Sequence, residues 1–155
     1  MILITGASGN VGREVLKQAA GEVKVRAAYM SENKAKEAPA GVETVLMDYA
    51  RPETVRAALD GIEKVFLVGP PSPNVAELED AFVNEAKKSR VRHLVKLSAL
   101  GGCKAIFPSL HRDSEEKIES SGFRTHSFAP TASSRISSIT TPALSRLRTV
   151  LCDAG

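Results

Sequence analysis

The sequence predicts a doubly wound α/β fold, in which a parallel sheet carries helices on both faces. Residues 2–4 (ILI) form a short unbroken apolar run of the kind found in strands that are buried on both faces. A glycine-rich turn follows, and short apolar runs then alternate with segments of helical spacing up to residue 123. Such alternation is typical of parallel strands joined by right-handed crossovers. We expect the strand order 3-2-1-4-5, with a ligand at the carboxyl ends of the strands where the order reverses.

Apolar runs, and the glycine and proline residues between them, give the expected elements. Strands are predicted at 2–4, 23–28, 42–47, 64–68 and 93–97. Helices are predicted at 10–20, from Pro52 to Asp60, at 74–90 and at 110–121. The 74–90 helix is expected to turn its apolar stripe inward, with Val75, Leu78, Phe82, Val83 and Ala86. A polar stretch at 31–36 follows the second strand.

The turn after the first apolar run reads TGASGNVG, with glycines at 6, 9 and 12. Gly6 permits a tight turn, Gly9 lets the backbone approach a diphosphate, and Gly12 lets the next helix pack closely on the strand. The N–H groups at the start of that helix, together with its dipole, then face the anion. The alternative is a turn that serves packing alone. The strand before it and the helix after it favour a dinucleotide site of the Rossmann type.

Composition limits the other classes of function. The chain of 155 residues is 43% hydrophobic and 25% charged, which is ordinary for one globular domain. No apolar stretch approaches the ~20 residues of a membrane span, and no basic leader precedes the first strand. Cys103 and Cys152 have no metal-ligand spacing and suggest no disulfide framework. We therefore expect a cytoplasmic protein without a bound metal.

The net charge of +3 comes from one end of the chain. Acidic and basic residues balance over residues 1–122, whereas residues 123–155 hold four arginines and one aspartate. A surface that binds nucleic acid gathers its basic residues on a folded face or along a helix, so no nucleic-acid partner is expected. The same end breaks the pattern of elements, because residues 124–155 hold eleven Ser and Thr residues and little apolar periodicity. We find no sixth strand there, only a short helix at 142–152.

Several segments, taken in order, resemble the NmrA-like group of atypical short-chain dehydrogenases/reductases. They are the turn at 5–12, Asp48 after the third strand, FLVGPPS at 66–72, VRHLVKLSALG at 91–101 and HRDSEEKIESSG at 111–122. The resemblance covers residues 1–123 and implies a Rossmann-like domain that binds NAD(P). In this group the cofactor serves quinone reductases and redox-sensing regulators.

Members of this group continue with a further strand, a Leu-Arg-Pro-like turn and a region that covers the substrate. We see none of these after residue 123, so we expect a nucleotide-binding domain at 1–123 and an atypical tail at 124–155. Our hypothesis is a frameshift or truncation of the gene near residue 124, which another reading frame of the coding DNA would reveal. The alternative is a divergent but genuine C-terminus.

The resemblance implies a nucleotide over the glycine turn, with the adenine near Asp48 and the nicotinamide ribose near Gly69 and Pro70. The turn residues are Gly6, Ser8, Gly9, Asn10, Val11 and Gly12. NAD sites commonly have an acid at the tip of the second strand, and none stands there. Met30 takes the place of an arginine found in many relatives. Arg13, Ser31 and Lys34 could contact a 2′-phosphate, which favours NADP slightly over NAD.

The residues for proton transfer depart from the family pattern. Classical members use a tyrosine as proton donor and a lysine four residues later, but His111 and Glu115 occupy those places. Ser98 matches the catalytic serine of the family, and His111 can in principle protonate a substrate oxygen near neutral pH. The alternative for His111 is a surface histidine at a helix start. Lys96 is expected to be structural, and Cys103 is expected to be an inert cysteine rather than a redox-sensitive thiol.

These observations predict an NAD(P)H-dependent oxidoreductase that reduces a quinone or another small electrophile. One alternative is a non-catalytic NAD(P)-sensing regulator, whose bound cofactor biases contact with a protein partner. The absent tyrosine and lysine favour that alternative. Another is a truncated nucleotide-binding remnant without a complete substrate pocket.

Overall fold

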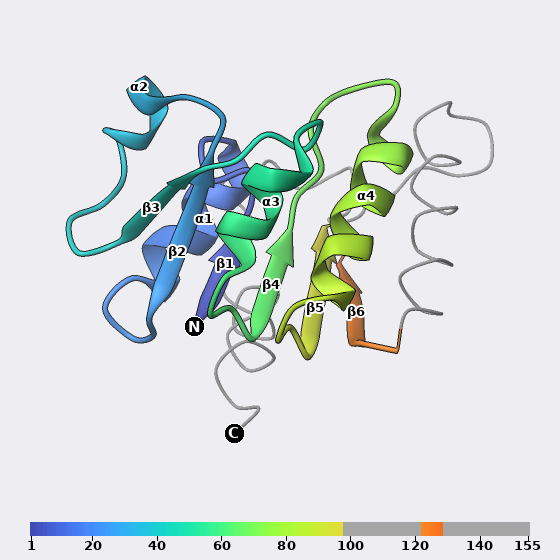
Figure 1. The fold of residues 1–155 in the computed structure, drawn as a ribbon. Coiled ribbons are helices and arrows are strands. Elements are labelled where there is room, and N and C mark those ends of the chain that lie inside the picture. Colours follow the sequence, from blue (N-terminus) through green and yellow to red (C-terminus); the bar gives the residue numbers. More distant parts are fainter. Residues whose placement is uncertain (98–121, 129–155) are drawn as a thin grey trace.

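Parallel strands form one sheet in the order β3-β2-β1-β4-β5-β6 (Figure 1). The computed structural model describes residues 1–97 and 122–128. Within them the strands are β1 (Ile2–Ile4), β2 (Val25–Tyr29), β3 (Glu43–Leu46), β4 (Lys64–Leu67), β5 (His93–Leu97) and β6 (Arg124–Phe128). Leu3 of β1 aligns with Arg26 on one side and with Val65 on the other. The strand order therefore reverses at β1, as the sequence predicts.

Helices cover both faces of this sheet. They are α1 (Asn10–Ala19), α2 (Glu32–Ala35), α3 (Pro52–Leu59) and α4 (Val75–Lys87). α3 and α4 lie in front of the sheet in Figure 1, α1 lies behind it, and α2 lies beyond the carboxyl end of β2. The doubly wound arrangement predicted from the sequence is therefore confirmed, with a sixth strand added.

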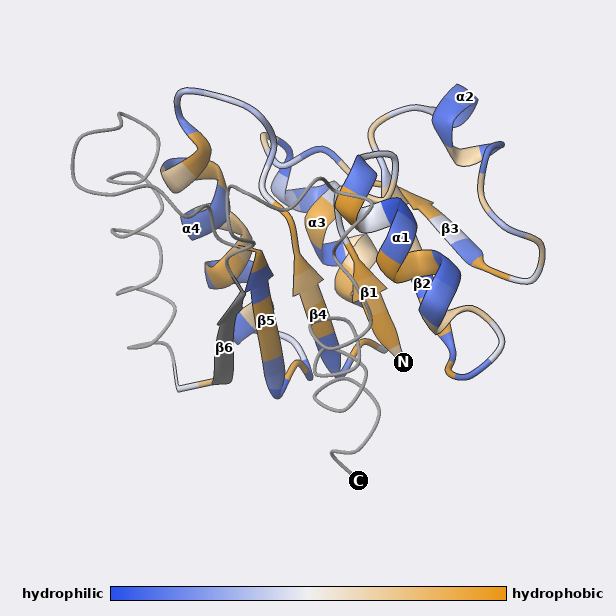
Figure 2. Ribbon diagram, turned by 180° about the vertical axis from the view of Figure 1, so that it is seen from behind, coloured by the Kyte–Doolittle hydropathy of each residue, from blue (hydrophilic) through white to orange (hydrophobic). Residues whose placement is uncertain are grey.

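The central strands β1 and β4 are apolar on both faces because helices cover each face of the sheet. Leu3, Val65 and Leu94 belong to the core beneath α3 and α4. Ile4 and Phe66, which point the other way, belong to the core beneath α1. The central strands are hydrophobic along most of their length in Figure 2. This is the pattern of a parallel sheet between two helical layers.

Two elements were not predicted from the sequence. β6 pairs with β5 in parallel, from His93↔Arg124 to Leu97↔Phe128. Its sequence RTHSF has no apolar alternation, so the pairing of its backbone with β5 is what identifies it as a strand. The expectation that no strand follows residue 123 is therefore wrong. The second element is α2, whose four residues are too few to show a helical period.

Several expected features lie outside the described residues: the helices at 110–121 and 142–152, and the cysteines Cys103 and Cys152. In the part that is described, no helix has both the length and the apolar character needed to cross a membrane. Residues 1–97 and 122–128 also hold no group of His, Cys, Asp or Glu side chains suited to a metal ion.

Candidate functional site

Packing requires glycine at two of the three positions in the turn between β1 and α1. Gly6 has a φ of +60°, and a Cβ there would lie 2.9 Å from the side chain of Val68. A Cβ at Gly12 would collide with the carbonyl oxygen of Gly6. Gly9 differs, because it is exposed and its Cβ would only approach that carbonyl to 3.2 Å. Gly6 and Gly12 therefore close the turn, while Gly9 presents bare backbone to solvent.

The first turn of α1 opens on the same exposed surface. Gly9 is the N-cap and gives the helix no side-chain hydrogen bond, and the first turn contains no acidic residue. The N–H groups of residues 10–12 precede the first helical hydrogen bond, which Arg13 donates to the Gly9 carbonyl at 2.9 Å. Free N–H groups at the positive end of a helix dipole are suited to a phosphate. The geometry therefore fits the diphosphate of a dinucleotide.

A hydrogen-bonded cluster fixes the carboxyl end of β4 next to this turn. The Val68 N–H donates to the Thr5 hydroxyl oxygen at 2.7 Å, and the Tyr49 hydroxyl donates to the Val68 carbonyl at 2.8 Å. Burial raises the pKa of Tyr49 above its usual value; the hydrogen bond with Thr5 lowers it, and the nearby Glu79 carboxylate raises it further. The phenol therefore stays protonated and acts as a donor. These bonds join the ends of β1, β3 and β4.

A buried ion pair lies against Gly69, the second residue after β4. The Lys96 ammonium donates to Glu79 Oε2 at 2.7 Å, and the two side chains are 1% and 0% exposed. A Cβ at Gly69 would collide with the Glu79 carboxylate and would lie 2.7 Å from Cγ2 of Val75. This contact links α4 to β5, and removing either partner would leave an uncompensated buried charge. It also requires glycine at the end of β4.

Asp48 has a structural task in the turn between β3 and α3. Its Oδ1 accepts a hydrogen bond from the Ala50 N–H at 2.9 Å, and its own N–H donates to the Thr54 hydroxyl at 3.0 Å. The residue is half-buried at the carboxyl edge of the sheet. Asp48 therefore lies at the carboxyl edge of the sheet, where the sequence predicts it, and it also shapes the turn that leads into α3.

The carboxyl end of β2 carries a cluster of charges. Tyr29 is buried there, whereas the next side chain, Met30, is 70% exposed. The Arg13 guanidinium lies 3.3 Å from Glu37 Oε2, and the Lys34 ammonium lies 3.1 Å from Glu37 Oε1. A pocket of about 200 Å³ opens beside them, lined by Ala7, Ser8, Arg13, Leu16, Lys17, Tyr29, Glu37 and Pro39. This pocket therefore connects the glycine turn to the end of β2.

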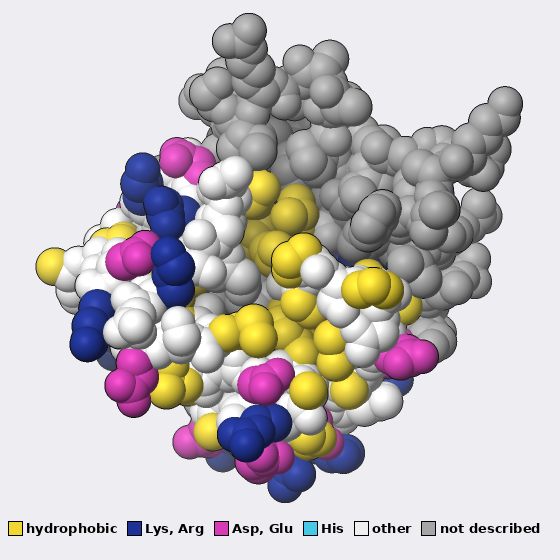
Figure 3. Space-filling model, turned by 90° about the horizontal axis from the view of Figure 1, so that it is seen from above, with side chains coloured by type: hydrophobic (Ala, Val, Ile, Leu, Met, Phe, Trp, Pro, Cys, Tyr) yellow, Lys and Arg dark blue, Asp and Glu magenta, His cyan; other side chains and the backbone are white. Residues whose placement is uncertain are grey.

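Figure 3 looks onto the carboxyl ends of the strands: apolar side chains gather in the middle of this face, and Lys and Arg side chains gather on the side of α2. The fold brings to this edge the eleven residues predicted to bind the nucleotide. They are Gly6, Ser8, Gly9, Asn10, Val11, Gly12, Arg13, Ser31, Asp48, Gly69 and Pro70. The two candidates for proton transfer, Ser98 and His111, lie outside the described residues.

Three site residues escaped the sequence analysis. Glu79 could have been noticed, because an acidic residue stands on the inward stripe of α4 between Val75 and Phe82. Tyr49 and Glu37 gave no such signal. Their partners, Val68 and Arg13, are 19 and 24 residues away in the chain. Only the fold brings those groups together.

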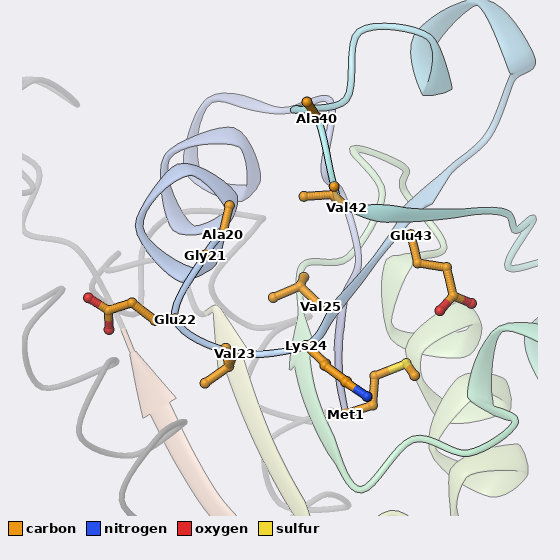
Figure 4. A pocket seen from close by; sticks show the side chains of 11 residues that line it. Met1, Ala20, Gly21, Glu22, Val23, Lys24, Val25, Ala40, Val42 and Glu43 are labelled. Carbon is orange, nitrogen blue, oxygen red and sulfur yellow. The ribbon is translucent and has the colours of Figure 1, made fainter.

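A larger groove of about 630 Å³ lies at the opposite end of the sheet, near the amino ends of β1, β2 and β3. Figure 4 shows the carboxylates of Glu22 and Glu43 pointing to opposite sides of it. Small apolar side chains, among them Val23, Val25 and Val42, make up much of the lining. Because its polar groups do not converge on one point, the carboxyl edge is the better candidate for a binding site.

Known proteins support the same assignment. A family model described as NAD(P)H-binding matches residues 6–129, so the match continues past residue 123 and includes β6. The chain is 32% identical over 128 residues to an NAD(P)H azoreductase of Xenophilus azovorans, covering 79% of this chain and 44% of the relative. It is 33% identical over 128 residues to a (4-alkanoyl-5-oxo-2,5-dihydrofuran-3-yl)methyl phosphate reductase of Streptomyces griseus, with the same coverage. The chain thus spans less than half the length of these curated relatives.

Solved structures share the fold. A triphenylmethane reductase of Citrobacter sp., complexed with NADP(H), superposes with a TM-score of 0.76 at 22% identity, covering 82% of this chain and 48% of that one. An NADPH-dependent quinone oxidoreductase of Escherichia coli, complexed with NADPH, superposes with a TM-score of 0.73 at 25% identity, covering 82% and 47%. The aligned part of this chain therefore corresponds to roughly half of each of those proteins.

Proposed function

The chain belongs to the NAD(P)H-binding family, among the NmrA-like, atypical short-chain reductases, and from this premise we propose that it binds NADPH at the carboxyl edge and reduces a quinone or a similar small electrophile. A single observation carries the proposal. The exposed start of α1 has no capping side chain and no acidic residue, and it opens over a turn whose packing demands glycine. That combination suits an anionic group such as a diphosphate.

Each part of the edge has a task in this proposal. The N–H groups of residues 10–12 bind the diphosphate, and Asp48 lies beside the adenine. Gly69 and Pro70 provide the surface for the nicotinamide ribose, while the ion pair of Glu79 with Lys96 fixes the backbone beneath them. Arg13, Ser31 and Lys34 take the 2′-phosphate, which is the reason for proposing NADPH rather than NADH. When bound, the reduced nicotinamide supplies a hydride.

The remaining chemistry requires the electrophile to be oriented and a proton to be delivered. A quinone takes up one hydride and one proton at its oxygens, and hydride transfer to it depends more on orientation than on a strong acid. We assign the hydrogen bond to the quinone oxygen to Ser98, and the proton to His111. This assignment rests on the matching of these residues to family positions.

A second function is favoured by one observation in the sequence. His111 and Glu115 stand where classical members have the tyrosine and lysine that transfer the proton. A chain that binds the cofactor without turnover would act as an NAD(P) sensor, whose occupancy changes its contact with a protein partner. The two functions differ in turnover and agree in cofactor binding.

Nucleotide titration of the purified chain tests the shared premise. We expect NADPH to bind, and Gly9→Val to abolish binding because its side chain occupies the space of the diphosphate. Gly9 has an ordinary φ of −77°, so the variant should fold. The matched control is Ala40→Val, an exposed alanine at the opposite end of the sheet, which should bind as the wild type does.

Unchanged affinity in Gly9→Val would move the site away from the glycine turn. Failure of the folded wild-type chain to bind either NADPH or NADH at millimolar concentration would overturn both functions. Steady-state oxidation of NADPH with a panel of quinones then separates them. Turnover supports the reductase, whereas binding without turnover supports the sensor.

A further inference from the structure

We propose that Glu37 is a specificity-determining residue for the cofactor: its carboxylate holds Arg13 and Lys34, the two cations that the 2′-phosphate of NADPH would need. The inference rests on the proposed function, because it concerns the same nucleotide site. It assigns to Glu37 the discrimination between NADPH and NADH.

The geometry places one cation on each oxygen of this carboxylate. Arg13 Nη2 lies 3.3 Å from Oε2, and Lys34 Nζ lies 3.1 Å from Oε1. The Arg13 guanidinium also donates to the Ser8 carbonyl at 3.4 Å, which ties it to the glycine turn. The three charged residues come from α1, from α2 and from the segment after α2. Glu37 thus links α1 to α2 through its two ion pairs, and no other side-chain ion pair among the described residues does so.

The cluster lies where a 2′-substituent of the adenosine ribose is expected. In sheets of this type the end of the second strand contacts that ribose, through an acid for a hydroxyl or through a cation for a phosphate. Here the tip of β2 offers neither, because Met30 stands there and is 70% exposed. Arg13 and Glu37 both line the pocket of about 200 Å³ whose wall includes Tyr29, the last residue of β2. The charges placed to contact the 2′-substituent therefore come from α1, from α2 and from the segment after α2.

A phosphate can take these cations only if the carboxylate gives way. A phosphate monoester carries about two negative charges near pH 7, so it is attracted by Arg13 and Lys34 and repelled by Glu37. About half of each side chain of the cluster is exposed, at 52% for Arg13, 50% for Glu37 and 53% for Lys34. Exposed ion pairs contribute little to stability, so the exchange costs the fold little. The 2′-hydroxyl of NADH carries no charge and leaves the cluster intact.

The experiment measures the affinities of NADPH and NADH for Glu37→Gln. Glutamine keeps the size of the side chain and removes its charge, so we expect NADPH to bind about five- to tenfold more tightly, with NADH changed by less than about twofold. Glu32→Gln is the matched control, since Glu32 is an exposed carboxylate of α2 outside this cluster, and both affinities should match the wild type. In Arg13→Gln/Glu37→Gln the gain for NADPH should be smaller than in Glu37→Gln, because only the Lys34 ammonium then remains to attract the phosphate.

The outcomes separate this inference from the proposed function. If the wild-type chain binds both nucleotides and Glu37→Gln leaves the NADPH affinity unchanged, the role of Glu37 is overturned while the proposed function stands. If the variant instead loses affinity for NADH alone, Glu37 binds the ribose hydroxyl of NADH. The inference that Glu37 competes with the 2′-phosphate for the two cations is then wrong. If neither chain binds NADPH or NADH, both proposals fail. Thermal melting establishes that each variant is folded before it is titrated.

Discussion

Glu79 and Glu37 both bind basic side chains, one in the core of the molecule and the other on its surface. Glu79 holds Lys96 at 2.7 Å, and neither side chain has more than 1% of its surface exposed. Glu37 holds Arg13 and Lys34 at 3.3 and 3.1 Å, and about half of each of these side chains is exposed. Removing one partner in the core leaves a buried charge, whereas on the surface water and salt replace the missing partner.

The difference shows how the same chemistry serves two purposes at one edge of a sheet. The core pair lies against Gly69 and joins α4 to β5, so it holds the carboxyl end of β4 in place. The surface cluster lies beside the end of β2 and can rearrange without disturbing the core. We therefore expect changes at Glu79 to appear as changes in stability, and changes at Glu37 to appear as changes in nucleotide preference.

The largest effect is expected from Glu79→Leu. It removes the carboxylate that pairs with the buried Lys96 ammonium, so we expect the free energy of unfolding to fall by about 3–5 kcal/mol. Urea denaturation followed by circular dichroism measures this change. A loss below about 1 kcal/mol would mean that the ammonium reaches water or another partner, and the contrast with the surface cluster would disappear.

A second variant keeps this prediction testable if Glu79→Leu does not fold. Glu79→Leu/Lys96→Met replaces both charged groups with apolar side chains of similar length. We expect it to recover most of the lost stability, because such replacements of buried pairs are often neutral. A double variant as unstable as the single one would show that packing, and not charge, dominates at this position.

The fold could be predicted largely from the sequence because the strands carry their own signal. β1 and β4 are apolar on both faces, β5 places Leu94 and Val95 in the two cores, and glycine, proline or aspartate marks the ends of most elements. β6 could not be predicted, since RTHSF has no apolar pattern and its place depends on the neighbouring β5. Local pattern therefore identified five of the strands and failed at β6, on one edge of the sheet.

The candidate site divides in the same way. The glycine turn could be predicted because its chemistry is local, and the packing of Gly6 and Gly12 confirms that glycine is needed there. The ion pairs could not be predicted, because Lys96 is 17 residues from Glu79 and Glu37 is 24 residues from Arg13. Charged side chains give no sequence signal for the partner that the fold brings to them.

A moderate effect is expected from Tyr49→Phe. Tyr49 is buried near Glu79 of the core pair. The variant loses the hydrogen bond to the Val68 carbonyl, so the free energy of unfolding should fall by about 1 kcal/mol near pH 7. The folded chain holds the phenol protonated, with the pKa of Tyr49 raised above the ~10 of an unfolded chain. Above about pH 10 the unfolded wild-type chain therefore releases this proton first, and the stability falls as the pH rises.

Phenylalanine has no such proton, so the stability of Tyr49→Phe should fall less steeply above about pH 10. The gap between the variant and the wild type should then narrow as the pH rises. Denaturation curves at a series of alkaline pH values measure both slopes. Parallel slopes would show that Tyr49 is ionised equally easily in the folded and unfolded chains, and that it does not belong to the buried region.

The smallest effect on stability is expected from Glu37→Gln, the variant with the largest expected effect on cofactor preference. Exposed ion pairs contribute about 0–1 kcal/mol, and both cations keep their contact with water, so we expect a change of about 0.5 kcal/mol or less. Raising the salt concentration from about 0.05 to 0.5 M should reduce even this difference, because salt screens exposed charges. A loss well above 1 kcal/mol that persists in high salt would show that Glu37 anchors α2 to α1. The surface cluster would then resemble the core pair, and its freedom to yield to a phosphate would be lost.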